Sequence, residues 1–466
     1  MYNITVKDII EQCSGKIIMG DINKECIDFS TDTRKIKQGD VYIGLKGEKF
    51  DGSQFYKQAL QSGASACILQ NIEIDNETKE NYKDRTIIIV EDTLKTLQKL
   101  AKYKRSKYNI PVIAITGSVG KTSTKDIIAS VVATKYNVLK TEGNFNNHIG
   151  LPLTILRLKD HDAMVVEMGM NNLGEISLLT DIAKPTIAVI TNVGTAHIGN
   201  LGSRENILKA KLEILEGLSQ DGTLIINNDN DMLHMWNEKN DIYKVLDFGI
   251  ENNSKLMAKD IKINSTSSQY KIIDKNEEIN IEVPIASKVF IYNSLSAICV
   301  GKTLNIEINK IIEGIKNFEL SKNRMEVTTI NKVTIINDCY NANFDSMKAS
   351  IESLAKMEGS RKIAILGDML ELGEFSQKLH SDIGKEICNN NIDILITVGE
   401  ESKNIAQNAI ENGMNKNNIY VLNNNTEVIN LITKIKQIND TILIKASNGM
   451  HFIEIVNELK VLLNKK

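Results

Sequence analysis

Residues 113–124 read Ile-Ala-Ile-Thr-Gly-Ser-Val-Gly-Lys-Thr-Ser-Thr, and this stretch decides the fold. The apolar, β-branched run at 111–116 predicts a buried parallel strand. Gly117 and Gly120 permit a sharp backbone turn, and helical spacing follows over 121–133. A strand, a glycine turn and a helix that opens with Lys-Thr predict a phosphate-binding loop. In such a loop, backbone N–H groups and the lysine face the anion, and the threonine holds Mg²⁺.

The spacing of this loop departs from the general phosphate-loop pattern. That pattern places a glycine five residues before the glycine of the Gly-Lys pair, where this chain has Ile115. The match is instead to a shorter Thr-Gly-Ser-x-Gly-Lys-Thr form. The alternative is an ordinary strand-to-helix turn with a chance Lys-Thr pair. Because a strand and a helix flank the loop correctly, phosphate binding is favoured.

Length and composition bound the class of protein. A chain of 466 residues exceeds a single core and predicts two to four domains. The formal net charge of −3 argues against a dedicated nucleic-acid or membrane-surface binder. The six cysteines contain no Cys-x-x-Cys pair and indicate reduced thiols in a cytoplasmic protein. No run approaches the roughly 20 apolar residues of a membrane span.

Three α/β units are predicted, with limits at 1–108, 109–318 and 319–466. The first unit reads as a small α/β domain in which 75–84 forms a polar loop. The middle unit alternates strands and helices, which predicts a parallel sheet with helices on both faces and ligands at the carboxyl ends of the strands. Within it, short polar-alternating strands at 256–283 predict an antiparallel edge. The third unit alternates again and predicts a second doubly wound, Rossmann-like domain.

Two strand ends in the middle unit carry candidate functional residues. Glu167 closes an apolar strand beside the phosphate loop, where a carboxylate suits Mg²⁺, and the alternative is a surface glutamate. His197 ends the loop at 191–197, although a lone loop histidine is more often structural. The polar loop at 141–152 offers side-chain amides to a ligand from Asn144, Asn146 and Asn147.

Lys211 lies in the middle of the apolar face of a helix predicted at 203–218, whereas Lys209 points the opposite way. A charged lysine in that place is costly unless it is paired or neutral. One solution, which the helix alone favours, is a salt bridge to Glu167 or to another acid. The other is a neutral amine of lowered pKa that takes up CO₂ and becomes an anionic carbamate.

Polar residues also end a strand in the third unit, and these are Asp338, Tyr340, Asn343 and Asp345. The first three are candidates to reach a nucleotide across a cleft, and the last to cap the next helix. Arg324 lies where the second and third units join, and its guanidinium suits terminal phosphates. In the first unit, 30–34 and 45–52 gather small polar, charged and glycine residues. These segments suit an anionic, hydroxyl-rich ligand, or they are plain surface loops.

The motifs, in chain order, are T-G-S-V-G-K-T, N-F-N-N-H-I-G-L-P, V-V-E-M-G-M, T-N-V-G-T-A-H, the helix of Lys211, N-D-C-Y-N-A-N and L-G-D-M-L-E-L-G. This ordered set resembles the Mur ligases of bacterial peptidoglycan synthesis. Y-N-A-N and G-D-M-L-E-L-G are most similar to the members that use ATP to join D-alanyl-D-alanine to UDP-N-acetylmuramoyl-tripeptide. The resemblance implies three α/β domains. They are a small N-terminal UDP-sugar-binding domain, a central P-loop-type ATP-binding domain with a parallel sheet, and a C-terminal Rossmann-like domain.

The resemblance also implies roles for individual residues. The ATP phosphates would lie on Gly117, Ser118, Val119, Gly120, Lys121, Thr122 and Ser123. The rest of the nucleotide would contact Asn293, Arg324, Asp338, Tyr340 and Asn343. Mg²⁺ would be held by Thr122, Glu167, His197 and, as its carbamate, Lys211. The UDP end of the sugar substrate would lie near Asp32, Thr33, Arg34, Lys46 and Gly47, and the muramoyl peptide near Asn144, Asn146 and Asn147. The residues implied in catalysis are Lys121, Glu167, His197, Lys211 and Arg324.

The chain departs from the family pattern at three places. The segment A-S-K-V-F-I-Y-N that ends at Asn293 lacks the usual Gly and His, Ser53 stands where His is common, and Lys445-Ala-Ser-Asn448 replaces Lys-Gly-Ser-Arg. We expect a monomer that acts on small-molecule substrates and binds no nucleic acid. The alternatives are a sister ligase (the one that adds the third residue, or a folylpolyglutamate synthase), a P-loop kinase, and a non-enzymatic nucleotide-binding protein.

Overall fold

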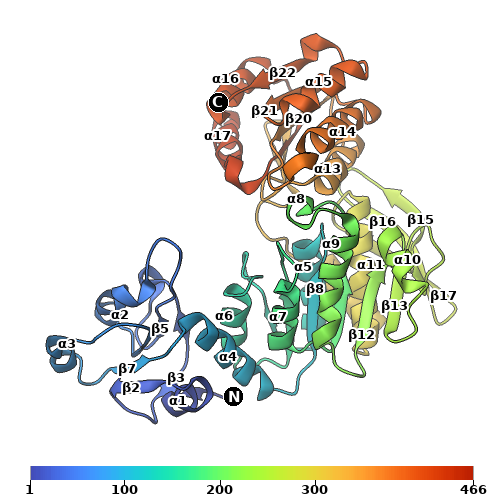
Figure 1. Cartoon of the computed structure of the whole chain (residues 1–466). Coiled ribbons are helices and arrows are strands. Elements are labelled where there is room, and N and C mark those ends of the chain that lie inside the picture. Colours follow the sequence, from blue (N-terminus) through green and yellow to red (C-terminus); the bar gives the residue numbers. More distant parts are fainter. Residues whose placement is uncertain (1, 465–466) are drawn as a thin grey trace.

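The computed structural model describes residues 2–464 as three α/β domains, which confirms the predicted fold class (Figure 1). In Figure 1 the N-terminal domain (blue) lies beside the central domain, and the C-terminal domain (orange to red) lies above it. Every sheet falls within one of the predicted units 1–108, 109–318 and 319–466, whose limits stay predictions. Within residues 2–464, no helix is both long enough and apolar enough to cross a bilayer.

The N-terminal domain is built on a five-stranded sheet that is parallel except for its edge strand β2. In spatial order the strands are β2 (Lys16–Met19), β7 (Thr86–Ile89), β6 (Ala66–Leu69), β5 (Val41–Ile43) and β4 (Phe29–Ser30). A separate antiparallel pair is formed by β1 (Ile4–Thr5) and β3 (Glu25–Cys26). The helices are α1 (Val6–Cys13), α2 (Tyr56–Gln61), α3 (Asn76–Asn81) and α4 (Thr93–Ser106). The predicted loop at 75–84 is wrong, because Asp75 accepts a hydrogen bond from the Thr78 N–H and caps the short helix α3.

The central domain has a seven-stranded sheet in which every neighbouring pair is parallel, as predicted. In spatial order the strands are β14 (Leu256–Met257), β13 (Lys244–Gly249), β12 (Thr223–Asn227), β11 (Ile187–Ile190), β8 (Val112–Thr116), β10 (Ala163–Glu167) and β9 (Val138–Lys140). Thr116 of β8 pairs with Ile190 of β11, and Glu167 of β10 pairs with Ile115. The carboxyl ends of these three strands are therefore level, and the loops that follow them meet at one edge of the sheet.

Helices cover both faces of this sheet because the side chains of β8 alternate between two cores. Ile113 and Ile115 belong to one core, and Val112 and Ala114 belong to the other. The first core is covered by α5 (Lys121–Ala133), α11 (Lys288–Thr303) and α12 (Ile308–Lys316). The second is covered by α6 (Gly150–Leu156), α7 (Glu175–Ala183) and α9 (Arg204–Leu212). Short helices α8 (Ile198–Leu201) and α10 (Asp231–Asn237) follow β11 and β12.

The prediction of an antiparallel edge at 256–283 is wrong in part. Leu256–Met257 form β14, which extends the parallel sheet. The antiparallel strands β15 (Lys259–Ile263), β16 (Ser268–Asp274) and β17 (Glu277–Val283) form a sheet of their own. Tyr270 and Ile272 of β16 are buried in the core that α11 and α12 cover, so this small sheet packs on helices instead of extending the large sheet.

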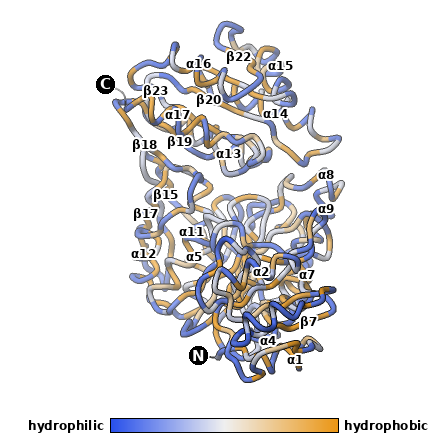
Figure 2. The backbone as a smooth tube through the Cα atoms, turned by 90° about the vertical axis from the view of Figure 1, so that its left-hand side faces the viewer, coloured by the Kyte–Doolittle hydropathy of each residue, from blue (hydrophilic) through white to orange (hydrophobic). Residues whose placement is uncertain are grey.

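The C-terminal domain has a six-stranded sheet that is parallel except for β18. In spatial order the strands are β18 (Glu326–Ile330), β19 (Val333–Asn337), β23 (Asp440–Lys445), β20 (Arg361–Gly367), β21 (Ile394–Val398) and β22 (Ile419–Leu422). The helices are α13 (Phe344–Lys356), α14 (Ser376–Asn389), α15 (Lys403–Glu411), α16 (Asn425–Ile435) and α17 (Ile453–Asn464). Figure 2 shows the same domain above the others, with α13 on the side that faces the central domain and α16 on the far side.

Candidate active site

A cavity of about 320 Å³ lies between the central and C-terminal domains, at the carboxyl edge of the central sheet. It brings together most of the predicted site residues. Those that line it are Ser118, Val119, Gly120, Lys121, Thr122, Ser123, Asn144, Asn146, Asn147, Glu167, His197, Arg324, Asp338, Tyr340 and Asn343. The position fits the rule that open parallel sheets bind ligands beyond the carboxyl ends of their strands.

The phosphate loop has the backbone that its glycines predict. Gly117 adopts a φ of +153°, and a Cβ there would lie 1.9 Å from the Thr191 hydroxyl oxygen. Gly120 adopts a φ of +83° and stands at the N-cap of α5, where no side chain caps the helix. The first-turn N–H groups of α5 therefore have no side-chain cap at the edge of the cavity. Such a helix N-terminus binds anions.

Asn192, which the sequence analysis did not single out, holds the start of this loop. Its side-chain oxygen accepts hydrogen bonds from the N–H groups of Ser118, at 3.0 Å, and Val119, at 2.9 Å. Two of the N–H groups predicted to cradle phosphate are thus bonded to Asn192, and the uncapped N–H groups at the cavity are those of the first turn of α5. Lys121 extends from that turn and donates to the carbonyl of Gly117 at 2.7 Å. Burial lowers the pKa of Lys121, while the nearby Glu167 carboxylate opposes this shift.

Glu167 is 2% exposed and joins the phosphate loop to the loop that follows β9. One carboxylate oxygen accepts from the Thr122 hydroxyl and the other from the Asn146 amide, both at 2.8 Å. A hydroxyl and a carboxylate are the oxygen donors that Mg²⁺ prefers, so the two residues fit this ion. Among residues 2–464, no cluster of three or more His, Cys, Asp and Glu side chains is placed to hold a metal. Because Mg²⁺ prefers octahedral coordination, the two oxygen donors would leave further positions for other ligands.

His197 has a left-handed backbone, with a φ of +63°, and its ring contacts the C-terminal domain through Glu371. Its Nδ1 lies 3.0 Å from a carboxylate oxygen of Glu371. Burial, and then the positive charge of Lys121, lower the pKa of His197 to about 3, so the ring is neutral near pH 7. A neutral ring that contacts a carboxylate through Nδ1 carries its hydrogen there, which leaves Nε2 with a free lone pair. Glu371 is a second residue that the sequence analysis did not single out.

Lys211 is 1% exposed, as its place on the apolar helix face predicts. The predicted helix at 203–218 is shorter than expected, since α9 ends at Leu212 and a 3₁₀ turn follows. The salt bridge that the helix alone favours is wrong, because no ion pair within residues 2–464 includes Lys211, no nearby acid raises its pKa, and both oxygens of Glu167 have other partners. Burial, and then the charge of Lys121, lower the pKa of Lys211 well below its usual value.

The C-terminal domain supplies a cation and its aromatic support. The Arg324 guanidinium lies over the Tyr340 ring, 4.0 Å from the centroid, and its buried Nε has no hydrogen-bond partner within residues 2–464. Asp338 accepts from the Ser350 hydroxyl at 2.7 Å and forms an ion pair with Lys445. An unpartnered guanidinium N–H at a cavity that also holds Lys121 suits a ligand with several negative charges.

Asn343 and Asp345, near the start of α13, have partners that differ from the prediction. Asn343, and not Asp345, caps α13 by accepting from the Ser346 N–H at 2.9 Å. Asp345 instead accepts from the N–H and the hydroxyl of Thr195, at 2.7 and 2.9 Å. The loop that carries His197 is therefore held by the C-terminal domain at two points.

Some predicted residues lie outside this cavity. Asn293 is 4% exposed and packs behind Gly120, because a Cβ on Gly120 would lie 3.1 Å from the side-chain oxygen of Asn293. The Nδ2 atom of Asn293 is buried and has no hydrogen-bond partner within residues 2–464. Gly117 and Lys211 also do not line the cavity. The remaining ones belong to the N-terminal domain and are Asp32, Thr33, Arg34, Lys46 and Gly47.

The five N-terminal residues lie after the neighbouring parallel strands β4 and β5. Arg34 is largely exposed and pairs with Asp32 at 2.8 Å. Beside Gly47, the exposed rings of Phe50 and Phe55 pack edge to face with their centroids 6.4 Å apart. An exposed aromatic pair beside the loop that carries Lys46 and Gly47 suits a planar base that carries phosphates. Neither ring was predicted as a site residue: Phe50 lies in the segment 45–52 noted above, and Phe55 follows that segment.

Comparisons with known proteins agree with this geometry. Three family models match the chain: "Mur ligase family, catalytic domain" at 29–105, "Mur ligase middle domain" at 115–301 and "Mur ligase, glutamate ligase domain" at 323–448. The chain is 38% identical over 463 residues to the UDP-N-acetylmuramoyl-tripeptide–D-alanyl-D-alanine ligase of Bacillus subtilis, covering 98% of this chain and 99% of that protein.

Solved structures show the same likeness along the whole chain. MurF from Acinetobacter baumannii matches with a TM-score of 0.88 and 28% identity, over 100% of both chains. MurF from Thermotoga maritima, solved in complex with ADP, matches with a TM-score of 0.82 and 28% identity, over 94% of this chain and 98% of that one. With all three domains matched in order by models of one family, the chain belongs to the Mur ligase family.

Proposed function

We propose that this protein uses ATP to add D-alanyl-D-alanine to UDP-N-acetylmuramoyl-tripeptide, giving the UDP-linked pentapeptide used in peptidoglycan synthesis. The observation that carries the proposal is the 38% identity, over 98% of the chain, to a ligase named for this reaction. The cavity supports it, because the phosphate loop, Glu167 and Arg324 meet there between two domains. The third-residue ligase and folylpolyglutamate synthase are less favoured, because the Y-N-A-N and G-D-M-L-E-L-G segments fit neither as well.

The reaction proceeds in two balanced steps. The terminal carboxylate of the tripeptide attacks the γ-phosphorus of ATP, and the bond to the β-phosphate oxygen breaks, giving an acyl phosphate and ADP. The amine of D-alanyl-D-alanine then attacks the acyl carbon, loses a proton, and the tetrahedral intermediate expels inorganic phosphate as the amide forms. Both reactants of the first step are anionic, so cations matter more there than a strong base.

The residues of the cavity divide this work. The uncapped N-terminus of α5 and Lys121 bind the phosphates, and Arg324 stabilises the negative charge of the phosphoryl group in transfer. Mg²⁺, when bound, neutralises phosphate charge, and Thr122, Glu167 and the free Nε2 of His197 would hold it. Asp338, Tyr340 and Asn343 border the nucleotide from the C-terminal side, whereas Asn293 supports the loop from behind.

Lys211 supplies a further anion in this proposal. A neutral lysine amine attacks CO₂, forms a C–N bond and releases one proton, which leaves a carbamate. Burial and the positive charge of Lys121 keep the amine of Lys211 neutral, and the same charge attracts the anionic carbamate. The carbamate would add a carboxylate-like ligand to the two oxygen donors of Thr122 and Glu167.

The N-terminal domain would bind the UDP part of the substrate. Arg34 and Lys46 provide positive charge after β4 and β5, with Asp32, Thr33 and Gly47 in the same loops, and the ring of Phe50 or Phe55 provides a face for the uracil. Asn144, Asn146 and Asn147 line the cavity on the side that the muramoyl peptide would enter. The predicted domain limits, a monomeric state and a cytoplasmic location belong to this proposal as well.

Isotope transfer tests the chemical step. With ¹⁸O in the terminal carboxylate of the tripeptide, the acyl-phosphate route places one ¹⁸O in each released phosphate. A P-loop kinase would instead transfer the γ-phosphate to a stable acceptor and release no labelled phosphate. A non-enzymatic nucleotide-binding protein would release none at all with both substrates present.

A further inference from the structure

The linker that carries Arg324 is held at its two ends by different domains. The N–H and hydroxyl of Ser321 donate to the buried carboxylate of Asp126 in α5, at 2.9 and 2.8 Å. Lys322, the next residue, is exposed. From Asn323 onward the partners belong to the C-terminal domain. Arg324 is therefore anchored to the C-terminal domain, although it precedes the first strand of that domain.

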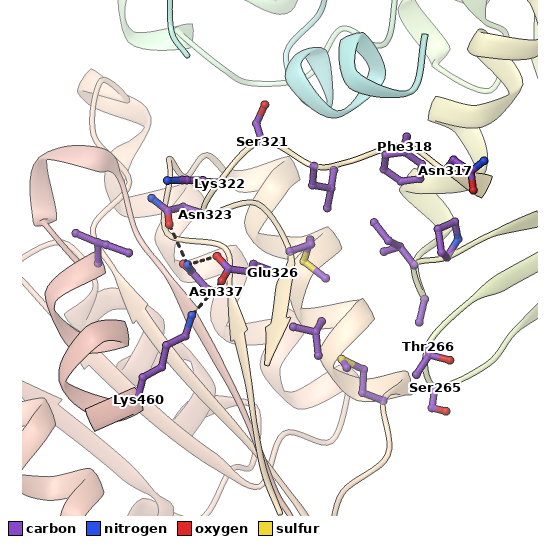
Figure 3. Close-up of a pocket in the computed structure, with 18 of the residues that line it drawn as sticks. Ser265, Thr266, Asn317, Phe318, Ser321, Lys322, Asn323, Glu326, Asn337 and Lys460 are labelled. Atoms are coloured by element: carbon purple, nitrogen blue, oxygen red, sulfur yellow. Dashed lines mark hydrogen bonds and ion pairs between the residues drawn. The ribbon is translucent and has the colours of Figure 1, made fainter. Parts of the chain in front are cut away.

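One buried amide connects the residues on either side of Arg324. Asn337, at the end of β19, is 1% exposed and donates both hydrogens of its amide. One goes to the side-chain oxygen of Asn323 and the other to a carboxylate oxygen of Glu326, each at 3.0 Å. Lys460 of α17 donates to the other Glu326 oxygen at 3.0 Å. Figure 3 shows these four side chains converging, with Lys460 and Asn323 reaching the pair from opposite sides.

The backbone between these anchors is unusual. Asn323 has a φ of +62° and Met325 a φ of +47°, so left-handed residues stand on both sides of Arg324. Residues other than glycine keep such angles only where their surroundings fix them. Here the Tyr340 N–H donates to the Asn323 carbonyl at 3.2 Å, and the Met325 N–H donates to Asp338 at 3.1 Å.

This conformation sends neighbouring side chains to different cavities. Asn323, Glu326, Asn337 and Lys460 line a second cavity of about 1090 Å³ (Figure 3). Arg324 instead lines the nucleotide cavity, over the ring of Tyr340. The linker thus forms a partition between the two cavities, and its anchors lie on the side away from the nucleotide.

We propose that Asn337 and Lys460 are positioning residues, which hold Asn323 and Glu326 so that the guanidinium of Arg324 reaches the terminal phosphates of ATP. The inference rests on the proposed function for the identity of the nucleotide, and it concerns residues to which no role has been given above. An amide that bridges two side chains three residues apart fixes the turn between them. A displacement of the Arg324 guanidinium by about 1 Å would be enough to lower the affinity for ATP by tenfold or more.

The test compares ATP with ADP on the full chain. Because Arg324 is inferred to reach the terminal phosphate, Arg324→Ala should weaken ATP binding about tenfold and ADP binding no more than about twofold. Asn323→Ala and Lys460→Met should shift the ATP-to-ADP affinity ratio in the same direction, by about three- to tenfold. Asn457→Ala, which changes an exposed residue of the second cavity outside the anchors, should leave the ratio unchanged. Calorimetric titration with each nucleotide measures all of these.

A double variant distinguishes positioning from a general loss of structure. If Asn323 acts through Arg324, the Asn323→Ala change should have no further effect on the ratio once Arg324 is alanine. Additive effects, or equal losses of ATP and ADP affinity, would overturn the inference, and so would an unchanged ratio in Asn323→Ala and Lys460→Met. Asn337→Asp, which removes both N–H donors of the amide, is a third variant. If it does not fold, the ATP-to-ADP ratios of Asn323→Ala and Lys460→Met decide the test. Since nucleotide binding needs no acceptor substrate, a failure of the proposed ligase activity would be seen separately.

Discussion

The carboxylate of Glu371 lies 3.0 Å from Nδ1 of His197, across the boundary between the C-terminal and central domains. Glu371 has a left-handed backbone, with a φ of +65°, as His197 does with +63°. Gly199, two residues after the histidine, packs against the backbone of Glu371 so closely that a Cβ would lie 2.6 Å from its carbonyl oxygen. One domain therefore orients a predicted metal ligand of the other.

Replacing Glu371 tests this orientation. Glu371→Ala should raise the Mg²⁺ concentration for half-maximal activity by about 10- to 100-fold, because partners that orient a ligating imidazole are worth that much in metal affinity. Ligase rates across a Mg²⁺ titration measure the effect. Glu374→Ala, an exposed carboxylate in the next turn, is the matched control and should leave the titration unchanged. Equal titrations for the two variants would show that Glu371 does not act on the metal site.

A methyl group at Gly117 should prevent nucleotide binding. Gly117→Ala would place its Cβ 1.9 Å from the Thr191 hydroxyl, so the loop must shift, at a cost of roughly 2–4 kcal/mol in the free energy of unfolding. Gly39→Ala is a control that also has a positive φ, +95°, but has no atom within 4 Å of the new Cβ. Urea unfolding and ATP titration of both variants separate the clash from the backbone strain. Comparable losses in the two would contradict the clash.

Replacing Lys211 tests the carbamate. Lys211→Ala should lower kcat by at least about 100-fold, and short carboxylates such as acetate should restore part of the rate by occupying the site of the carbamate. Lys209→Ala changes an exposed lysine of the same helix and should be nearly silent, with or without acetate. A Lys211→Ala enzyme that keeps its rate, or that no carboxylate rescues, would count against carbamylation.

Removal of metal should stop the reaction, and Glu167 should set how much metal is needed. Excess EDTA should abolish activity, and excess Mg²⁺ should restore it. Glu167→Gln keeps the size of the side chain and an oxygen that can accept from the Asn146 amide, but it loses the negative charge that attracts a divalent cation. We expect it to need at least about tenfold more Mg²⁺. The same Mg²⁺ requirement in Glu167→Gln and the unaltered protein would rule out Glu167 as a ligand.

The parts of the fold and site that were predictable are those set by local sequence. The glycine turn and the periodicity after it predicted α5 at 121–133, and the helix spans Lys121–Ala133. Because parallel strands end at one edge, strand-end residues such as Glu167 and His197 were expected together, and they line one cavity. The burial of Lys211 followed from its place on an apolar helix face.

The parts that were missed depend on contacts between distant segments. Asn192 is recognisable only once its loop is seen to end beside Ser118 and Val119. Glu371 acquires a role only when the C-terminal domain docks on His197. The helix α3 was missed for a local reason instead, because its six residues have no apolar periodicity, although the side-chain cap at Asp75 does signal a helix start.

The most direct test of the central claim is phosphate release from ATP and Mg²⁺, measured with UDP-N-acetylmuramoyl-tripeptide and D-alanyl-D-alanine together and singly. We predict release only with both, accompanied by a product heavier than the tripeptide substrate by the mass of the dipeptide less one water. Release with D-alanyl-D-alanine alone, or a product that gains a single amino acid instead of the dipeptide, would contradict the proposed reaction.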